Sequence, residues 1–253
     1  MKTDDSREIL LRGERLSKRF TDKDRQIDAL SEVDVFLRRG EFLGVVGESG
    51  SGKSTLLKVI SGLLPVDAGE IYCGEERMTG CGAREMGKRL QMIFQDAKSS
   101  FDPRFSMVHS ILESGRGKRD LAEVRALIDL VGLDSVLLSR KPAALSGGQC
   151  QRMAIVRALY NGADILLCDE ITSALDVSSQ AQIVGILKKL KEQRGLAVLF
   201  VSHDIALVRM LCDRVLVMQN GRVVEGGRIA NVVDDPQDPY TRQLIESARR
   251  QSL

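Results

Sequence analysis

Two short glycine-containing segments constrain this chain more than any other feature. The first, Gly47–Ser54, reads Gly-Glu-Ser-Gly-Ser-Gly-Lys-Ser and follows the apolar run Phe42–Val46; the second, Leu145–Gln149, reads Leu-Ser-Gly-Gly-Gln. Glycines let backbone N–H groups approach phosphate oxygens, and Lys53 adds a positive charge. With good helix formers over Ser54–Ile60, the pattern predicts a strand, a phosphate-binding loop and a helix.

The composition limits the classes of protein that the chain can belong to. Its 253 residues, 43% of them hydrophobic, can form one large domain. Lysine and arginine (37) nearly balance aspartate and glutamate (35), and only 4% of residues are aromatic, so nothing favours nucleic-acid binding. The five cysteines form no CxxC pair, and their odd number predicts reduced thiols; they are Cys73, Cys81, Cys150, Cys168 and Cys212.

No segment predicts export or membrane insertion. Met1–Arg7 is polar and lacks the apolar core of a secretion signal. The longest apolar stretch, around Leu196–Val201, is far shorter than the roughly 20 residues that span a bilayer. We therefore expect any membrane association to go through a partner.

The order of the elements predicts an α/β fold. Alternating polar and apolar residues over 9–42 predict an antiparallel strand pair with a turn near Thr21–Arg25. Strands at Met92–Phe94, Ile165–Cys168 and Ala197–Val201 alternate with helices at Ser146–Tyr160 and Ile183–Lys191. The alternation predicts a mostly parallel core sheet with ligands at the carboxyl ends of its strands.

Three further segments complete this organisation. Lys118–Leu133 has apolar residues at helical spacing, which predicts an inserted α-helical lobe at about residues 96–145. Arg214–Glu225 carries Asn220-Gly221 between two apolar runs, the pattern of a hairpin. The tail, residues 234–253, holds a short helix-like segment. We expect one domain over residues 1–253.

Two acidic residues follow a strand that is predicted to be buried. Asp169 suits a carboxylate directed toward a magnesium ion held by Ser54, and Glu170 is the candidate base for the attacking water. Lys53 is expected to reach the β and γ phosphates of a nucleotide. The alternative for the acidic pair is an exposed turn.

The second segment predicts a second anion site at a helix N-terminus. The helix from Ser146 to Tyr160, about 15 residues at roughly 1.5 Å each, would hold this site about 20 Å from the strand that ends in Asp169. One chain cannot easily close both sites on one nucleotide. Two chains arranged head to tail can.

These segments, in this order, resemble the ATP-binding cassette (ABC) ATPases over essentially the whole chain. Gly47–Thr55 resembles Walker A, Leu145–Gln149 the signature, and Ile165–Glu170 Walker B. Ser173–Asp176 is similar to the D-loop. The resemblance implies a P-loop ABC nucleotide-binding domain with an N-terminal antiparallel β subdomain, ATP hydrolysis, and ATP and Mg²⁺ as ligands.

The site residues follow from the residues above and from this resemblance. The expected catalytic residues are Lys53, Gln95, Glu170 and His203, and the expected metal site is Ser54, Gln95 and Asp169. The expected nucleotide-binding residues are Phe20, Gly47, Glu48, Ser49, Gly50, Ser51, Gly52, Lys53, Ser54, Thr55, Gln95, Ser146, Gly147, Gly148, Gln149, Asp176 and His203.

Several of these residues have an alternative role. His203 matches the switch histidine and Gln95 the Q-loop, yet alone they would be a strand-end histidine and a polar loop residue. Phe20 falls where the family stacks adenine, and the alternative is a core phenylalanine. Asp176 either contacts the second subunit or caps the following helix. His109 matches nothing and is taken as structural.

Two stretches resemble a subclass, the dipeptide, oligopeptide and nickel importers. They are Phe94–Asp96 followed by Ser99–Arg104, and the tail Pro236–Leu244, in which Asp238 replaces the usual histidine. Ile171 replaces a common proline after Walker B. The resemblance implies a peripheral subunit at the cytoplasmic face of the inner membrane that drives uptake of peptides or of nickel, free or chelated. Its expected partners are a second ATPase subunit, paralogous or identical, transmembrane permease subunits and, indirectly, an extracytoplasmic substrate-binding protein. The alternatives are a non-transport single-cassette ATPase, as in iron–sulfur assembly, and an exporter ATPase.

Overall fold

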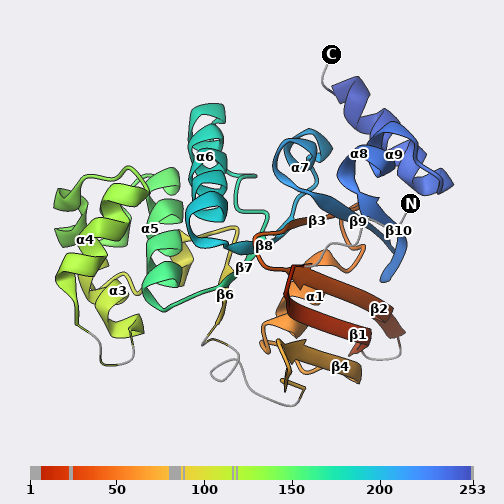
Figure 1. Cartoon of the computed structure of the whole chain (residues 1–253), viewed down its shortest axis with the longest axis horizontal. Helices are drawn as coiled ribbons and strands as arrows, with labels where there is room; N and C mark the ends of the chain where they lie inside the picture. Colours follow the sequence, from red (N-terminus) through yellow and green to blue (C-terminus); the bar gives the residue numbers. More distant parts are fainter. Residues whose placement is uncertain are drawn as a thin grey trace.

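The structure is a computed structural model that describes residues 7–251, except 23–24, 80–86, 88, 116 and 118. Two sheets and a group of helices make up the fold (Figure 1). The predicted turn near Thr21–Arg25 falls partly outside the described residues. Cys81 lies outside them.

The first sheet has four strands in the order β2-β1-β4-β5. β1 (Ile9–Asp22) pairs antiparallel with β2 (Arg25–Arg38), which confirms the predicted strand pair. β1 also pairs with β4 (Ala68–Cys73), and β4 with β5 (Glu76–Arg77), both antiparallel. These last two strands were not predicted, because glycines and polar residues interrupt their apolar pattern.

The second sheet has six strands in the order β10-β9-β3-β8-β7-β6. All its pairs are parallel except β9 with β10, so the predicted mostly parallel sheet is confirmed. The strands are β3 (Phe42–Val46), β6 (Leu90–Ile93), β7 (Ile165–Asp169), β8 (Ala197–Val201), β9 (Arg214–Gln219) and β10 (Arg222–Arg228). The last two form the predicted hairpin.

Helices pack on this second sheet or, in a group at its edge, on one another. They are α1 (Lys53–Ile60), α3 (Met107–Ser114), α4 (Leu121–Leu130), α5 (Gly147–Tyr160), α6 (Val177–Arg194), α7 (Ile205–Leu211), α8 (Ile229–Asp234) and α9 (Pro239–Gln251). Figure 1 shows α3, α4 and α5 together on the left, away from α1 and the four-stranded sheet. The division into one domain with a lobe at about 96–145 stays a prediction.

Capping residues account for the helix ends that differ from the prediction. α4 begins after Asp120, whose side chain accepts the Glu123 N–H, and ends before Gly132, which has φ 65°. α6 is twice as long as predicted, because it begins directly after Asp176, whose side chain accepts the Ser179 N–H. Its first turns show little apolar periodicity, so only the cap marks them.

Hydrophobic residues pack on both faces of the six-stranded sheet. On one face Leu43 and Val45 of β3 join α1 and the four-stranded sheet. On the other face Phe42 of β3 and Phe200 of β8 join α5 and α6. This alternation follows the period of two along a strand. It anchors the carboxyl ends of β3, β7 and β8, where the candidate site lies.

Candidate nucleotide-binding site

The phosphate loop ends in a helix N-terminus without a side-chain cap. α1 begins at Lys53 after Gly52, which has φ 105° and makes no side-chain capping bond. The first N–H groups of a helix have no intrahelical acceptor. The loop therefore offers free donors and the positive end of a helix, which is what a phosphate group needs.

Two glycines of the loop are required by the backbone around them. A Cβ on Gly47 would lie 2.1 Å from the Met218 carbonyl oxygen, and one on Gly52 would lie 2.4 Å from that of Ala29. A Cβ on Gly50, by contrast, would meet nothing within 4 Å. The loop is thus pressed against β9 and β2 on one side and open on the other, where a ligand can enter.

Lys53 is folded back onto its own loop. Its Nζ donates to the carbonyl oxygens of Gly47 and Glu48, each at 2.8 Å. Burial lowers the pKa of Lys53, while the carboxylates of Glu170, Asp169 and Glu48 oppose that shift. The ammonium group is therefore poorly hydrated and close to acidic groups, so an incoming phosphate would gain a strong partner.

Ser54 and Asp169 come together as the sequence predicts for a metal site. The Ser54 hydroxyl donates to Asp169 Oδ1 at 2.9 Å. Burial raises the pKa of Asp169, partly offset by this hydrogen bond. A hydroxyl and a carboxylate oxygen are ligands that Mg²⁺ prefers, and Mg²⁺ keeps waters in its remaining positions. These two residues fit a magnesium ion shared with a nucleotide.

Glu170 and His203 face each other across the ends of β7 and β8. His203 Nδ1 lies 3.7 Å from Glu170 Oε2. Glu170 has φ 47°, and its N–H donates to the Val201 carbonyl at 3.1 Å. A non-glycine residue in this left-handed region is strained, and such strain is concentrated at functional sites. The backbone thus holds the Glu170 carboxylate at the end of β7, close to Lys53 of the phosphate loop.

Gln95 is connected to Glu170 by hydrogen bonds through Ser173, to which the sequence assigned no role of its own. Its Nε2 donates to the Ser173 hydroxyl at 2.9 Å, and that hydroxyl donates to the Glu170 carbonyl at 2.9 Å. Ser173 therefore links Gln95 to Glu170. Sequence reasoning placed Ser173 only within the D-loop resemblance, because a serine alone carries no spacing signal.

The second segment forms a capping box at the start of α5. The Ser146 hydroxyl accepts the Gln149 N–H at 3.2 Å, and Gln149 Oε1 accepts the Ser146 N–H at 3.0 Å. A Cβ on Gly148 would lie 3.0 Å from Ser179 Oγ of α6, so the two helix starts pack closely. Both segments are fully described, and no hydrogen bond or ion pair joins residues 145–149 to residues 47–55.

The remaining predicted residues take varied positions. Phe20 on β1 is 39% exposed and so is not a core residue; Lys18 Nζ lies 5.8 Å from its ring centroid. Asp176 caps α6, as its alternative role required. His109 stacks on Phe105 at 4.3 Å. The described cysteines Cys73, Cys150, Cys168 and Cys212 are free thiols, as predicted.

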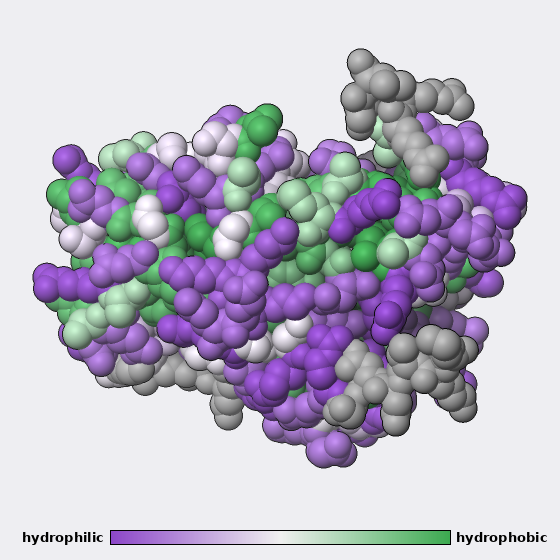
Figure 2. All heavy atoms as spheres, turned by 45° about the horizontal axis from the view of Figure 1, so that its top comes forward, coloured by the Kyte–Doolittle hydropathy of each residue, from purple (hydrophilic) through white to green (hydrophobic). Residues whose placement is uncertain are grey.

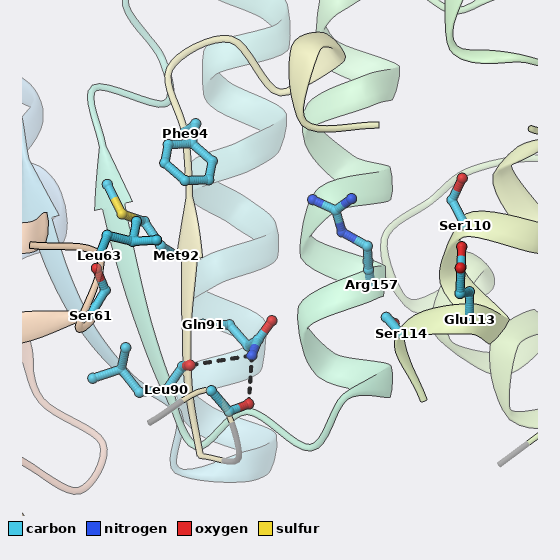
Figure 3. Close-up of a pocket in the computed structure, with 11 residues that line it drawn as sticks. Ser61, Leu63, Leu90, Gln91, Met92, Phe94, Ser110, Glu113, Ser114 and Arg157 are labelled. Carbon is cyan, nitrogen blue, oxygen red and sulfur yellow. Dashed lines mark hydrogen bonds between the residues drawn. The ribbon is translucent and has the colours of Figure 1, made fainter. Parts of the chain in front are cut away.

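A separate pocket is lined in part by Phe94, the residue that precedes Gln95. It has a volume of ≈ 400 Å³ and is lined by residues of β6, α3, α5 and the segment after α1. In Figure 3, Leu63, Met92 and Phe94 gather on one side, and Ser110, Glu113 and Arg157 lie on the other. Leu63 and Phe94 are 47% and 36% exposed. The pocket thus joins an exposed apolar wall to a charged one.

A parallel sheet with this loop at the end of β3 and two carboxylates at the end of β7 defines a P-loop nucleotide-binding protein. Residues 30–173 match the family model described as ABC transporter. The match covers more than half of the chain, so the chain belongs to the ABC transporter ATP-binding family. None of the helices in the described part of the chain combines the length and the apolar character of a membrane-spanning segment.

Curated relatives cover most of the chain. A putative peptide import ATP-binding protein of Brucella abortus is 42% identical over 232 residues, 88% of this chain and 70% of its own length. The oligopeptide transport ATP-binding protein OppF of Haemophilus influenzae is 41% identical over 238 residues, 90% of this chain and 72% of its own. The probable D,D-dipeptide transport ATP-binding protein DdpF of Escherichia coli is 42% identical over 230 residues, 87% and 70%.

Solved ATP-binding cassettes share the fold. A dimeric cassette in a post-hydrolysis state, bound to ADP and Pi, superposes with a TM-score of 0.78 at 29% identity, covering 87% of this chain and 98% of that one. A nucleotide-free cassette from an ABC transporter has a TM-score of 0.79 at 25% identity, with 93% and 98% covered. The predicted fold class is confirmed.

Proposed function

We propose that this chain is the ATP-hydrolysing subunit of a membrane importer that takes up peptides. The observation that carries the proposal is the meeting of Lys53, Ser54, Asp169 and Glu170 at the carboxyl ends of β3 and β7. The names of the three relatives above support peptides as the cargo. Nickel and its chelates stay an untested prediction, as do the non-transport and exporter alternatives.

The loop residues 47–55 bind the phosphates of ATP in this proposal. The uncapped N-terminus of α1 donates N–H bonds to phosphate oxygens, and Lys53 leaves the carbonyls of Gly47 and Glu48 to pair with the β and γ phosphates. Ser54 and Asp169 hold the magnesium ion with Gln95. When bound, the ion neutralises the charge that develops on the phosphates. Phe20, exposed on β1, stacks on the adenine.

Glu170 directs the attacking water. Its strained backbone fixes the carboxylate at the end of β7, and from there it accepts a hydrogen bond from water aligned with the γ-phosphate. His203, 3.7 Å away, contacts the γ-phosphate. Gln95 exchanges its hydrogen bond to Ser173 for contacts with the metal and the water. Nucleotide binding therefore moves the segment that follows β6.

A second subunit completes each site. The start of α5 makes no bond to the phosphate loop of its own chain, so Ser146, Gly147, Gly148 and Gln149 contact ATP held by another cassette. Asp176 then lies at the contact between subunits. One of the solved neighbours is itself a dimer with ADP and Pi. A paralogous heterodimer is proposed first, and a homodimer is the alternative.

The pocket beside Gln95 receives a permease segment at the cytoplasmic face of the inner membrane. An amphipathic segment fits this pocket, because the exposed apolar wall faces a wall that carries Glu113 and Arg157. The pocket is lined by β6, and Gln95 follows β6 directly, so a movement of β6 would displace Gln95. Figure 2 shows hydrophobic residues gathered in a band across the middle of one face, with hydrophilic residues around it. Such a face is typical of a chain with protein partners.

Co-purification tests this proposal. A tagged chain expressed in its native cells should retain a multi-helix membrane protein, and ATPase activity of that complex should rise when a peptide-loaded binding protein is added. Leu63→Glu, in the pocket wall, should release the membrane protein, while Val136→Glu, at another exposed apolar residue, should not. Recovery of the chain with soluble iron–sulfur assembly proteins alone would contradict the proposal.

A further inference from the structure

Tyr240 in the tail contacts the phosphate loop. The Tyr240 hydroxyl, at the start of α9, accepts the backbone N–H of Glu48 at 2.8 Å. The two residues are 192 positions apart. Tyr240 is 8% exposed, and burial raises the pKa of its hydroxyl, with the Glu48 N–H acting against that shift. The contact is therefore a partly buried hydrogen bond between distant segments.

The tail that presents Tyr240 is itself tightly held. Both carboxylate oxygens of Glu225 on β10 accept backbone N–H groups, from Gln237 at 2.9 Å and Asp238 at 3.0 Å. Asp238 Oδ1 in turn accepts the Tyr240 N–H at 2.8 Å. Ile245, five residues further along α9, is 3% exposed in the main core. Figure 1 shows α9 lying beside α8 and β10. A fixed turn thus aims the hydroxyl at the loop.

Glu48 connects Tyr240 to Lys53 through hydrogen bonds of its backbone. Its N–H is bound by Tyr240, while its carbonyl accepts both the Lys53 ammonium at 2.8 Å and the Ser51 N–H at 3.2 Å. From the other side, the Gly221 N–H of the β9–β10 turn donates to the Ser51 carbonyl at 3.0 Å. The tail and the hairpin therefore each bind one backbone group of the loop, the Glu48 N–H and the Ser51 carbonyl.

We propose that Tyr240 is a positioning residue of the nucleotide site, through which the tail fixes the phosphate loop in its binding conformation. A loop that is already ordered loses less entropy when ATP binds. Without the hydroxyl, the Glu48 N–H loses its acceptor in the tail, and the loop samples other conformations. The inference rests on the proposed function only in that ATP is the ligand.

Tyr240→Phe removes the hydroxyl and little else. We expect the dissociation constant for ATP to rise about three- to tenfold, the range for one lost hydrogen bond. Turnover at saturating ATP should change less than the dissociation constant, because the carboxylates of β7 stay in place. Hydrogen exchange of the peptide that contains Glu48 should become faster in the nucleotide-free protein.

Tyr160→Phe is the matched control. Tyr160 is 4% exposed, and its hydroxyl likewise accepts a backbone N–H, that of Asp120 at 3.0 Å, among the helices left of the sheet in Figure 1. It should lose a similar amount of thermal stability with unchanged ATP affinity and unchanged exchange at Glu48. Asp238→Ala, which frees the Tyr240 N–H, should resemble Tyr240→Phe and serves if that variant is not obtained folded.

The outcomes separate the two proposals. If the wild-type chain does not bind ATP, the proposed function fails. If it binds ATP, and Tyr240→Phe matches both the wild type and Tyr160→Phe in affinity and in Glu48 exchange, the positioning role is wrong. Equal loss of affinity in both tyrosine variants would also overturn it, because the effect would then be general destabilisation.

Discussion

Ser146 has two functions in this account, and one substitution separates them. Its hydroxyl oxygen accepts the Gln149 N–H in the capping box of α5. Among the described residues, no acceptor is bonded to the hydroxyl proton, so it is left to donate to a phosphate held by the partner. Ser146→Ala removes the cap and this donor together.

The two losses have different magnitudes and different readouts. A lost N-cap costs about 1 kcal/mol of stability, or about 2–4 °C in the thermal midpoint of a chain of this size. A lost hydrogen bond to a charged phosphate costs about 1.5–3 kcal/mol, which lowers turnover by about 10- to 150-fold if that bond is made in the transition state.

Asp120→Ala is the control for the cap. Asp120 accepts the Glu123 N–H at the start of α4, at 3.0 Å, and is not a predicted site residue. Both variants should show the same small loss in thermal midpoint, and only Ser146→Ala should lose ATPase turnover. Equal turnover in the two variants would refute the assignment of Ser146 to a partner's nucleotide.

Two further substitutions test the loop and the metal site. Gly52→Ala places a Cβ 2.4 Å from the Ala29 carbonyl oxygen at φ 105° and should destabilise the chain by about 1–3 kcal/mol. The control, Gly185→Ala, lies in open space within α6 and should stabilise the chain by about 0.5–1 kcal/mol. Thermal melting of both variants checks this prediction, and equal shifts of the thermal midpoint would contradict it. Asp169→Asn should raise the thermal midpoint of the nucleotide-free protein at neutral pH, because burial raises the pKa of Asp169 above its ordinary 3.8 and its ionised form is costly. That cost appears as pH rises from 3.8 through the raised pKa, so the advantage of the variant should shrink on acidification; a variant less stable than the wild type at neutral pH would refute the sign.

Much of the site could be predicted from the sequence, because its residues lie at strand ends and helix starts. Phe42–Val46 followed by the glycine pattern fixed the loop, and four apolar residues before Asp169 placed that carboxylate at the edge where Ser54 begins a helix. Such signals are local and depend on the period of a strand and on the donors at a helix start.

The rest depends on contacts between distant segments. β4 was missed because it packs by pairing with β1, and not by an apolar pattern of its own. The links from Gln95 through Ser173 to Glu170, and from Tyr240 to Glu48, join single polar side chains. A serine or a tyrosine carries no spacing signal, so only the folded chain reveals these partners.

Glu170→Gln tests the central claim most directly. The substitution keeps the size of the side chain and removes the carboxylate that lies 3.7 Å from His203. Loss of a general base costs about 10²- to 10⁴-fold in rate, so single-turnover hydrolysis should slow by that factor while ATP binding is retained. Hydrolysis at the wild-type rate would contradict the account.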